Sequence, residues 1–167
     1  AGGMLGAQAV ARAVPDGYTW LFTGGGTLVT NLYLFKTLPY DPVRDLTPVA
    51  LVTRGSGFLI SINNDVPAKS LAEVLALEKA KPGLLSYAVD SSNIYTAVLG
   101  RLINRAAGTQ MTEIPYKSTP QAIQDTVAGR TQVIISALSS MDNAVRAGKV
   151  RRVAISSAAR HPTYPHL

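Results

Sequence analysis

Two short stretches of the sequence carry glycines, hydroxyls and amides that could bind an anion. In the first, residues 18–30, the apolar run Trp20-Leu21-Phe22 is followed by Thr23-Gly24-Gly25-Gly26-Thr27. Glycines allow a backbone to bend sharply and to approach a ligand closely, and Thr27 is suited to cap a short helix over residues 28–33. A helix start presents unpaired N–H groups and a partial positive charge, which both favour an anion.

The second stretch, residues 85–96, repeats this plan with a strand LSYAV, a polar loop DSSN and a predicted helix. We expect the two loops to face each other across a cleft and to form one anion-binding site. A further hydroxyl, Ser136, follows the apolar strand at 133–135. The predicted ligand-binding residues are Thr23, Gly25, Gly26, Thr27, Ser91, Ser92, Asn93, Thr96 and Ser136.

Residues for catalysis or metal binding are sparse. The sequence has no cysteine, and its two histidines, His161 and His166, lie in the C-terminal tail. The ten acidic residues form no cluster typical of a metal site, and no metalloprotease, nucleophile-elbow or phosphate-loop motif is present. Asp90 is the single carboxylate in a predicted site loop, and we interpret it as a loop or capping residue. The sequence predicts a binding protein and not an enzyme, with no metal and no cofactor.

Composition favours a globular protein. The chain has 167 residues, of which 47% are hydrophobic, and no apolar run reaches the roughly 18 residues needed to span a bilayer. The formal net charge of +6 indicates either a basic surface without a specific partner or attraction of small anions. Nucleic-acid binding is not predicted, because no run of Lys and Arg is interleaved with aromatic residues.

Strands and helices alternate in the second half of the chain. Ser70-Leu71-Ala72-Glu73 is a capping box that starts a helix. Continuous apolar strands separated by helices are typical of a parallel sheet covered on both faces, and ligands bind such sheets beyond the carboxyl ends of the strands. Apolar strands are predicted at 20–22, 48–52, 58–62, 86–89, 133–135 and 153–155. Loops at 90–93, 116–119 and 136–140 are the candidate site loops.

The glycines of Gly55-Ser56-Gly57 interrupt the apolar sequence between two predicted strands. They indicate either a crossing point between two lobes, where a few residues absorb a rotation, or a simple bulge or loop.

Several short motifs, in order along nearly the whole chain, resemble the Bug family, the solute-binding proteins of tripartite tricarboxylate transporters. These motifs are A-G-G-M-L-G-A at 1–7, P-D-G-Y-T at 15–19, L-P-Y-D-P at 38–42, R-D-L-T-P-V-A at 44–50, V-P-A-K-S-L at 66–71, K-P-G at 81–83, Y-A at 87–88, I-P-Y-K-S at 114–118, A-G-R at 128–130 and A-G-K-V-R at 147–151.

This resemblance implies an α/β fold of the periplasmic-binding-protein type (type II) with two doubly wound lobes, here as a fragment lacking the family's N- and C-terminal segments. It implies part of lobe one at 1–62, lobe two at 63–152, and a crossing strand with the tail at 153–167. It also implies a periplasmic receptor that captures a small carboxylate in the cleft between the lobes and delivers it to the membrane components of a transporter.

The chain departs from the family pattern in the second candidate stretch. Ala97 stands at the family's usual histidine position, Ile94 and Tyr95 replace small or hydroxyl residues, and Ser136 stands where an acid is common. These departures indicate a narrower or more apolar pocket, for an aromatic or monocarboxylate ligand. The alternative functions are an effector-binding domain of a transcriptional regulator and an enzyme on the same fold.

Overall fold

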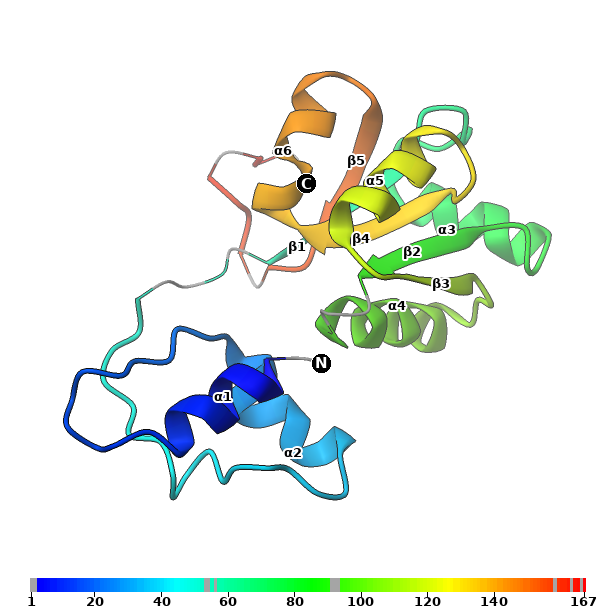
Figure 1. Ribbon diagram of the computed structural model, residues 1–167. Coiled ribbons are helices and arrows are strands. Elements are labelled where there is room, and N and C mark those ends of the chain that lie inside the picture. The colour runs from blue at the N-terminus through cyan, green and yellow to red at the C-terminus, as the bar shows by residue number, and fades with distance from the viewer. Residues whose placement is uncertain are drawn as a thin grey trace. The chain divides into compact units, whose positions relative to one another are not determined.

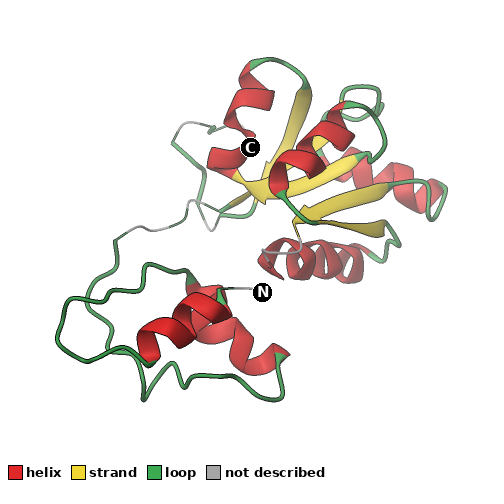
Figure 2. Ribbon diagram, viewed as in Figure 1, coloured by secondary structure: helices red, strands yellow, loops and turns green. Residues whose placement is uncertain are grey.

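The computed structural model describes residues 3–52, 55, 57–90, 94–157, 159–162, 164, 165 and 167. The chain forms two compact units, residues 1–54 and 55–167. Their helices and strands are labelled in Figure 1 and coloured by type in Figure 2. The lobe boundaries expected from the sequence, 1–62, 63–152 and 153–167, remain a prediction.

The second unit is built on one five-stranded sheet with the order β3-β2-β4-β1-β5 (Figure 1). Strand β2 is parallel to both β3 and β4, whereas β1 is antiparallel to both β4 and β5. The strands are β1 (Phe58–Asn63), β2 (Ser86–Asp90), β3 (Thr112–Tyr116), β4 (Val133–Ala137) and β5 (Val150–Ile155).

The prediction of an all-parallel sheet was therefore wrong for β1. In the antiparallel register Leu59 lies opposite Ile155, so the start of β1 and the end of β5 meet at one edge of the sheet. The Ser156 N–H donates to the Phe58 carbonyl at 2.9 Å, and the Phe58 N–H donates to Ser156 Oγ at 2.9 Å. An apolar run shows that a strand is buried, but it does not show the direction in which the strand crosses the sheet.

Helices cover both faces of this sheet (Figure 2). On one face α3 (Leu71–Ala80) and α4 (Ile94–Ala107) pack on Ile60, Ile62 and neighbouring strand residues. On the other face α5 (Thr119–Val127) and α6 (Leu138–Arg146) pack on Leu59, Ile134 and their neighbours. None of the helices that the structure describes has the length and apolar character that a bilayer crossing requires.

The cap predicted at Ser70 for α3 is confirmed, and the return bond of Glu73 goes to the residue before the N-cap. Ser70 Oγ accepts a hydrogen bond from the Glu73 N–H at 3.2 Å, and Glu73 Oε2 accepts one from the Lys69 N–H at 2.7 Å. The first bond satisfies a backbone donor of the first helical turn, and the second fixes the segment that leads into the helix.

The first unit is helical where it is regular. It contains α1 (Met4–Ala11), a π-helical turn (Gly26–Thr30) and α2 (Asn31–Leu34), and none of its described residues, 3–52, lies in a strand. The strands predicted at 20–22 and 48–52 were wrong: the Trp20 and Phe22 side chains are 66% and 77% exposed. An extended apolar segment becomes a strand only when a neighbouring strand pairs with its N–H and C=O groups, and the described part of this unit provides none.

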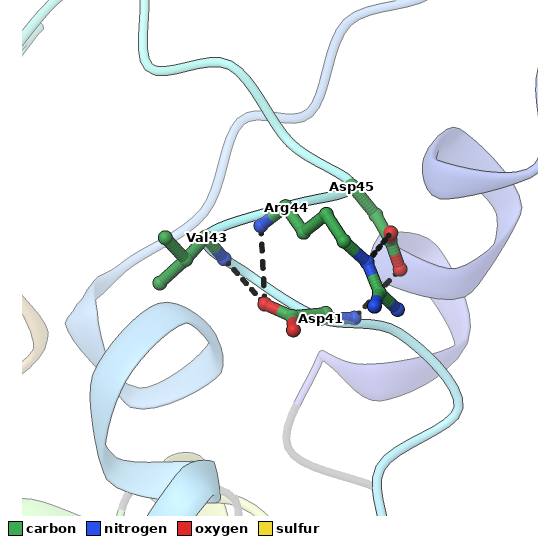
Figure 3. Close-up of polar contacts among 4 residues, drawn as sticks. All are labelled: Asp41, Val43, Arg44 and Asp45. Carbon is green, nitrogen blue, oxygen red and sulfur yellow. Dashed lines mark hydrogen bonds and ion pairs between the residues drawn. The ribbon is translucent and has the colours of Figure 1, made fainter.

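A compact turn at 41–45 follows α2 in the first unit (Figure 3). Asp41 Oδ1 accepts hydrogen bonds from the N–H groups of Val43 and Arg44, and Asp45 Oδ2 accepts one from the Asp41 N–H. The Arg44 and Val43 N–H groups hold the pKa of the Asp41 carboxyl below its usual value. The motif L-P-Y-D-P-V-R-D thus encodes a turn held by two carboxylates.

Replacing Gly100 with alanine should destabilise the second unit. A methyl group at this position of α4 would lie 2.2 Å from Cε2 of the buried Tyr87 ring. Overpacking of this kind costs about 1–3 kcal/mol, and alanine gains roughly 1 kcal/mol over glycine in a helix, so we expect a net loss of up to about 2 kcal/mol. Urea denaturation should show a lower free energy of unfolding. Gly6→Ala in α1 is the control, because its methyl group would meet only Leu21 at 3.9 Å; equal effects of both variants would contradict the packing account.

Acid should remove a contribution to stability from Glu113. Its carboxylate accepts hydrogen bonds from Arg101 Nε and Nη2 and from the Tyr87 hydroxyl, each at 2.8 Å. The bonds from Arg101 chiefly hold the Glu113 pKa below 4.5. Because this pKa is lowered in the folded state, the contribution is complete above pH 4.5 and is lost as the pH falls further.

The test compares the free energies of unfolding of wild type and Glu113→Gln from about pH 6 to about pH 3. Arg101 is largely exposed, so we expect a difference of only about 1 kcal/mol at the upper end of this range, shrinking towards the acid end. A difference that stays constant over this range would contradict the assignment.

Candidate functional site

Three strands of the second unit end at the same edge of the sheet. Because β2 is parallel to β3 and β4, their last residues, Asp90, Tyr116 and Ala137, lie at one edge, which we call the carboxyl edge. Helices α4, α5 and α6 each follow one of these strands and begin at this edge. Phe58, opposite Ala137 in the β1–β4 register, also lies there.

At the carboxyl edge, the N-termini of the helices differ from the N-terminus of α3. None of α4, α5 and α6 has an acidic residue in its first turn within the described sequence. Ser118 and Ala137, the N-cap residues of α5 and α6, make no side-chain capping bond in the described structure. In contrast, α3 has both the Ser70 cap and Glu73. The carboxyl edge thus combines the positive ends of three helices, and the carboxylate of Asp90, at the end of β2, bonds to Thr119 at the start of α5.

The loops at the opposite edge of the sheet, the amino edge, are held by side chains that bond to backbone groups. Glu78 accepts from the N–H groups of Gly83 and Leu85 at 2.6 and 2.9 Å, and Asn104 Nδ2 donates to the Met111 carbonyl at 2.9 Å. Similar bonds are made by Asn63 to Thr126 and Val127, by Arg151 to Val66 and Ala68, by Asn64 to Gly148 and by Gln132 to Gly129. This edge is built for stability, which leaves the carboxyl edge as the candidate site.

Asp90 has a structural partner at the carboxyl edge. The Thr119 hydroxyl, in the first turn of α5, donates to Asp90 Oδ2 at 2.5 Å. This bond joins the end of β2 to the start of α5. It agrees with the interpretation of Asp90 as a loop or capping residue.

The predicted site residues of the second unit are only partly placed. Ser91, Ser92 and Asn93 lie outside the described residues. Thr96, in the first turn of α4, and Ser136, near the end of β4, are at the carboxyl edge, but their side chains are buried, with 1% and 4% exposed. Both therefore present little surface to a ligand within this unit.

The structure brings the two predicted threonines of the first unit together. The Thr23 hydroxyl donates to Thr27 Oγ1 at 2.8 Å, and Thr27 is buried. The helix begins at Gly26 with Gly25 as its N-cap, so the prediction that Thr27 caps the helix was wrong. Thr27 lies inside the first turn because its N–H already bonds to the Gly24 carbonyl at 3.1 Å.

Sequence reasoning missed two residues that fix this segment. The Tyr40 hydroxyl donates to the Thr27 carbonyl at 2.6 Å and accepts from Asn31 Nδ2 at 3.4 Å. Gly3, at the start of α1, has φ of 76°, and a side chain there would meet Thr27 Oγ1 at 2.3 Å. The motifs A-G-G-M and L-P-Y-D-P were the available signals, but neither shows that its residues meet Thr27.

An open groove in the first unit contains none of the predicted site residues. Its volume is ≈ 470 Å³, and it lies between the end of α2 and the turn at 41–45. Leu32, Phe35, Tyr40 and Arg44 are among its lining residues. Within the described part of the chain, no group of acidic residues and histidines is arranged to hold a metal ion.

Comparison with known proteins places the whole chain in one family. The family model described as "Tripartite tricarboxylate transporter family receptor" matches residues 1–167. A UPF0065 protein of Bordetella bronchiseptica is 34% identical over 100% of this chain and 49% of its own length. Protein BugT of Bordetella pertussis is 30% identical over 99% of this chain and 51% of its own length.

Solved structures agree with this result. R. palustris Rpa4515 with adipate has a TM-score of 0.89 at 30% identity, and the match covers 99% of this chain and 55% of that chain. MatC from Rhodopseudomonas palustris with bound malate has a TM-score of 0.75 at 29% identity, covering 100% and 56%. The α/β periplasmic-binding-protein fold predicted from the sequence is thereby confirmed, and the chain spans about half the length of these relatives.

Replacing Tyr40 with phenylalanine should loosen the helix start at 26–30. The change removes the hydroxyl that donates to the buried Thr27 carbonyl, a loss of about 1 kcal/mol, so amide hydrogen exchange across Gly26–Thr30 should speed up about fivefold. Tyr33→Phe is the control, because the Tyr33 side chain is 84% exposed. If both variants exchange at the wild-type rate, Tyr40 does not hold this segment.

Proposed function

The chain belongs to the family of tripartite tricarboxylate transporter receptors, and from this premise we propose that it forms part of a solute-binding receptor for a small carboxylate. The receptor binds its ligand without altering it. We further propose that the whole protein works in the periplasm and passes the ligand to the membrane components of a transporter. Two relatives have been solved with dicarboxylates, adipate and malate, which supports this ligand class.

The carboxyl edge of the second unit is the observation that carries this proposal. Helices α4, α5 and α6 all start there, and none has an acidic residue in its own first turn within the described sequence. The Asp90 carboxylate lies beside the α5 start, on Thr119, so the starts of α4 and α6 are the main candidates for binding the anion. Unpaired N–H groups and aligned peptide dipoles at a helix start stabilise a negative charge. A carboxylate oxygen can accept hydrogen bonds from such N–H groups without a cationic side chain.

We assign different roles to the predicted site residues. Ser91, Ser92 and Asn93, between β2 and α4, are proposed to donate directly to the ligand. The buried Thr96 and Ser136 are proposed to support the helix and strand ends behind the site. The amides of Gly25 and Gly26 and the hydroxyls of Thr23 and Thr27 remain the predicted contribution of the first unit.

The proposal is tested by isothermal titration calorimetry of the full-length protein that contains this chain. The panel is succinate, adipate, malate and citrate, with uncharged succinamide as the control. We expect at least one carboxylate to bind and succinamide not to bind, because the site recognises charge. Failure of every carboxylate, or equal binding of succinamide, would overturn the proposed function.

Introducing a negative charge at the start of α6 tests whether the ligand binds there. Ser140→Asp adds a carboxylate at an exposed position in the first turn of α6. It should stabilise the helix by about 0.5 kcal/mol but weaken ligand binding about fivefold, because it competes with the ligand for the same positive end. Asn143→Asp adds the same charge to the last turn of α6 and should leave the affinity nearly unchanged. Unchanged affinity in Ser140→Asp would exclude the α6 start from the site.

A further inference from the structure

Two aromatic side chains from different elements meet at the carboxyl edge. Phe58 is the first residue of β1 and lies opposite Ala137, the last residue of β4. Tyr95 is in the first turn of α4. Their ring centroids are 6.3 Å apart and the rings are tilted by 32°, a favourable separation for an aromatic pair. The two rings therefore form one apolar surface beside the helix starts.

This pair differs from the other apolar residues of the second unit. Phe58 packs partly against the core cluster that contains Ile60 and Ile62, so its ring is anchored. Tyr95 is 37% exposed, and among the described residues of this unit it is the only large exposed aromatic side chain at the carboxyl edge. The pair presents an anchored ring and an accessible ring in the region where an anion would bind.

The helix starts and the aromatic pair at the carboxyl edge suit a ligand that has both a carboxylate group and an apolar body. The helix starts favour a carboxylate group, whereas an aromatic surface gains little from a hydroxyl group and much from covering an apolar chain or ring. Ligand sites typically combine an apolar wall with a few polar groups that fix orientation. Hydroxylated and apolar carboxylates of equal charge should therefore differ in affinity here.

We propose that the Phe58–Tyr95 pair forms the selectivity wall of the site and favours carboxylates with an apolar body over hydroxylated carboxylates of the same charge. This inference rests on the proposed function, because it concerns the same edge. Tyr95 acts through its ring, which covers the apolar part of the ligand. Tyr95 is not among the residues of the core cluster that contains Ile60 and Ile62, or of the side chains packed against it, so we expect its substitution to leave that cluster intact.

The test measures the affinities of the full-length protein for phenylsuccinate, succinate and malate by calorimetry. All three carry two carboxylates on the same short backbone, and they differ in a phenyl or a hydroxyl group. We expect wild type to bind phenylsuccinate about tenfold more tightly than malate. Tyr95→Ala should reduce this ratio severalfold, whereas Tyr95→Phe, which keeps the ring, should preserve it.

Leu102→Ala is the matched control, because Leu102 is an exposed apolar residue two turns further along α4, and it should leave the ratio unchanged. A wild-type preference for malate, or an equal loss of affinity for all three ligands in Tyr95→Ala, would overturn the selectivity wall and leave carboxylate binding in place. If wild type binds none of these three ligands and also fails to bind adipate and citrate, the proposed function is overturned as well.

Discussion

The parallel pairing of β2 with both β3 and β4 is the constraint on which the candidate site depends. Parallel strands end at the same edge of a sheet, so the helices that follow them begin at that edge. The antiparallel strands β1 and β5 then bring the start of one and the end of the other to this edge. As a result, three helix starts, the Asp90–Thr119 bond and the Phe58–Tyr95 pair all lie at one edge of the same sheet.

The two edges of the sheet differ in how their backbone groups are bonded. At the amino edge, buried or partly buried side chains such as Glu78, Asn63 and Asn104 bond to loop backbone groups. These bonds satisfy groups that would otherwise be costly to bury. At the carboxyl edge, α5 and α6 make no side-chain capping bond among the described residues. The N–H groups at a helix start are the kind of donor that an anionic ligand requires.

The sequence allowed the second unit to be predicted more fully than the first. The Ser70–Glu73 box and the apolar runs at 58–62, 86–89 and 133–135 correspond to elements of the structure, because local pattern and tertiary packing agree there. The run Trp20-Leu21-Phe22 failed because a strand needs a partner. The contacts Tyr40–Thr27 and Phe58–Tyr95 join residues far apart in the sequence, and no local pattern indicates that such residues meet.

If this protein is a carboxylate receptor of the proposed kind, backbone amides at the starts of α4, α5 and α6 bind the ligand. The most direct measurement is the change in the backbone amide chemical shifts of the full-length protein when succinate or adipate is added. We predict saturable changes in the first turns of these three helices and little change in the amino-edge loops at 81–85 and 128–132. Saturable changes confined to other parts of the protein, with these first turns unaffected, would show that the helix starts do not bind the ligand.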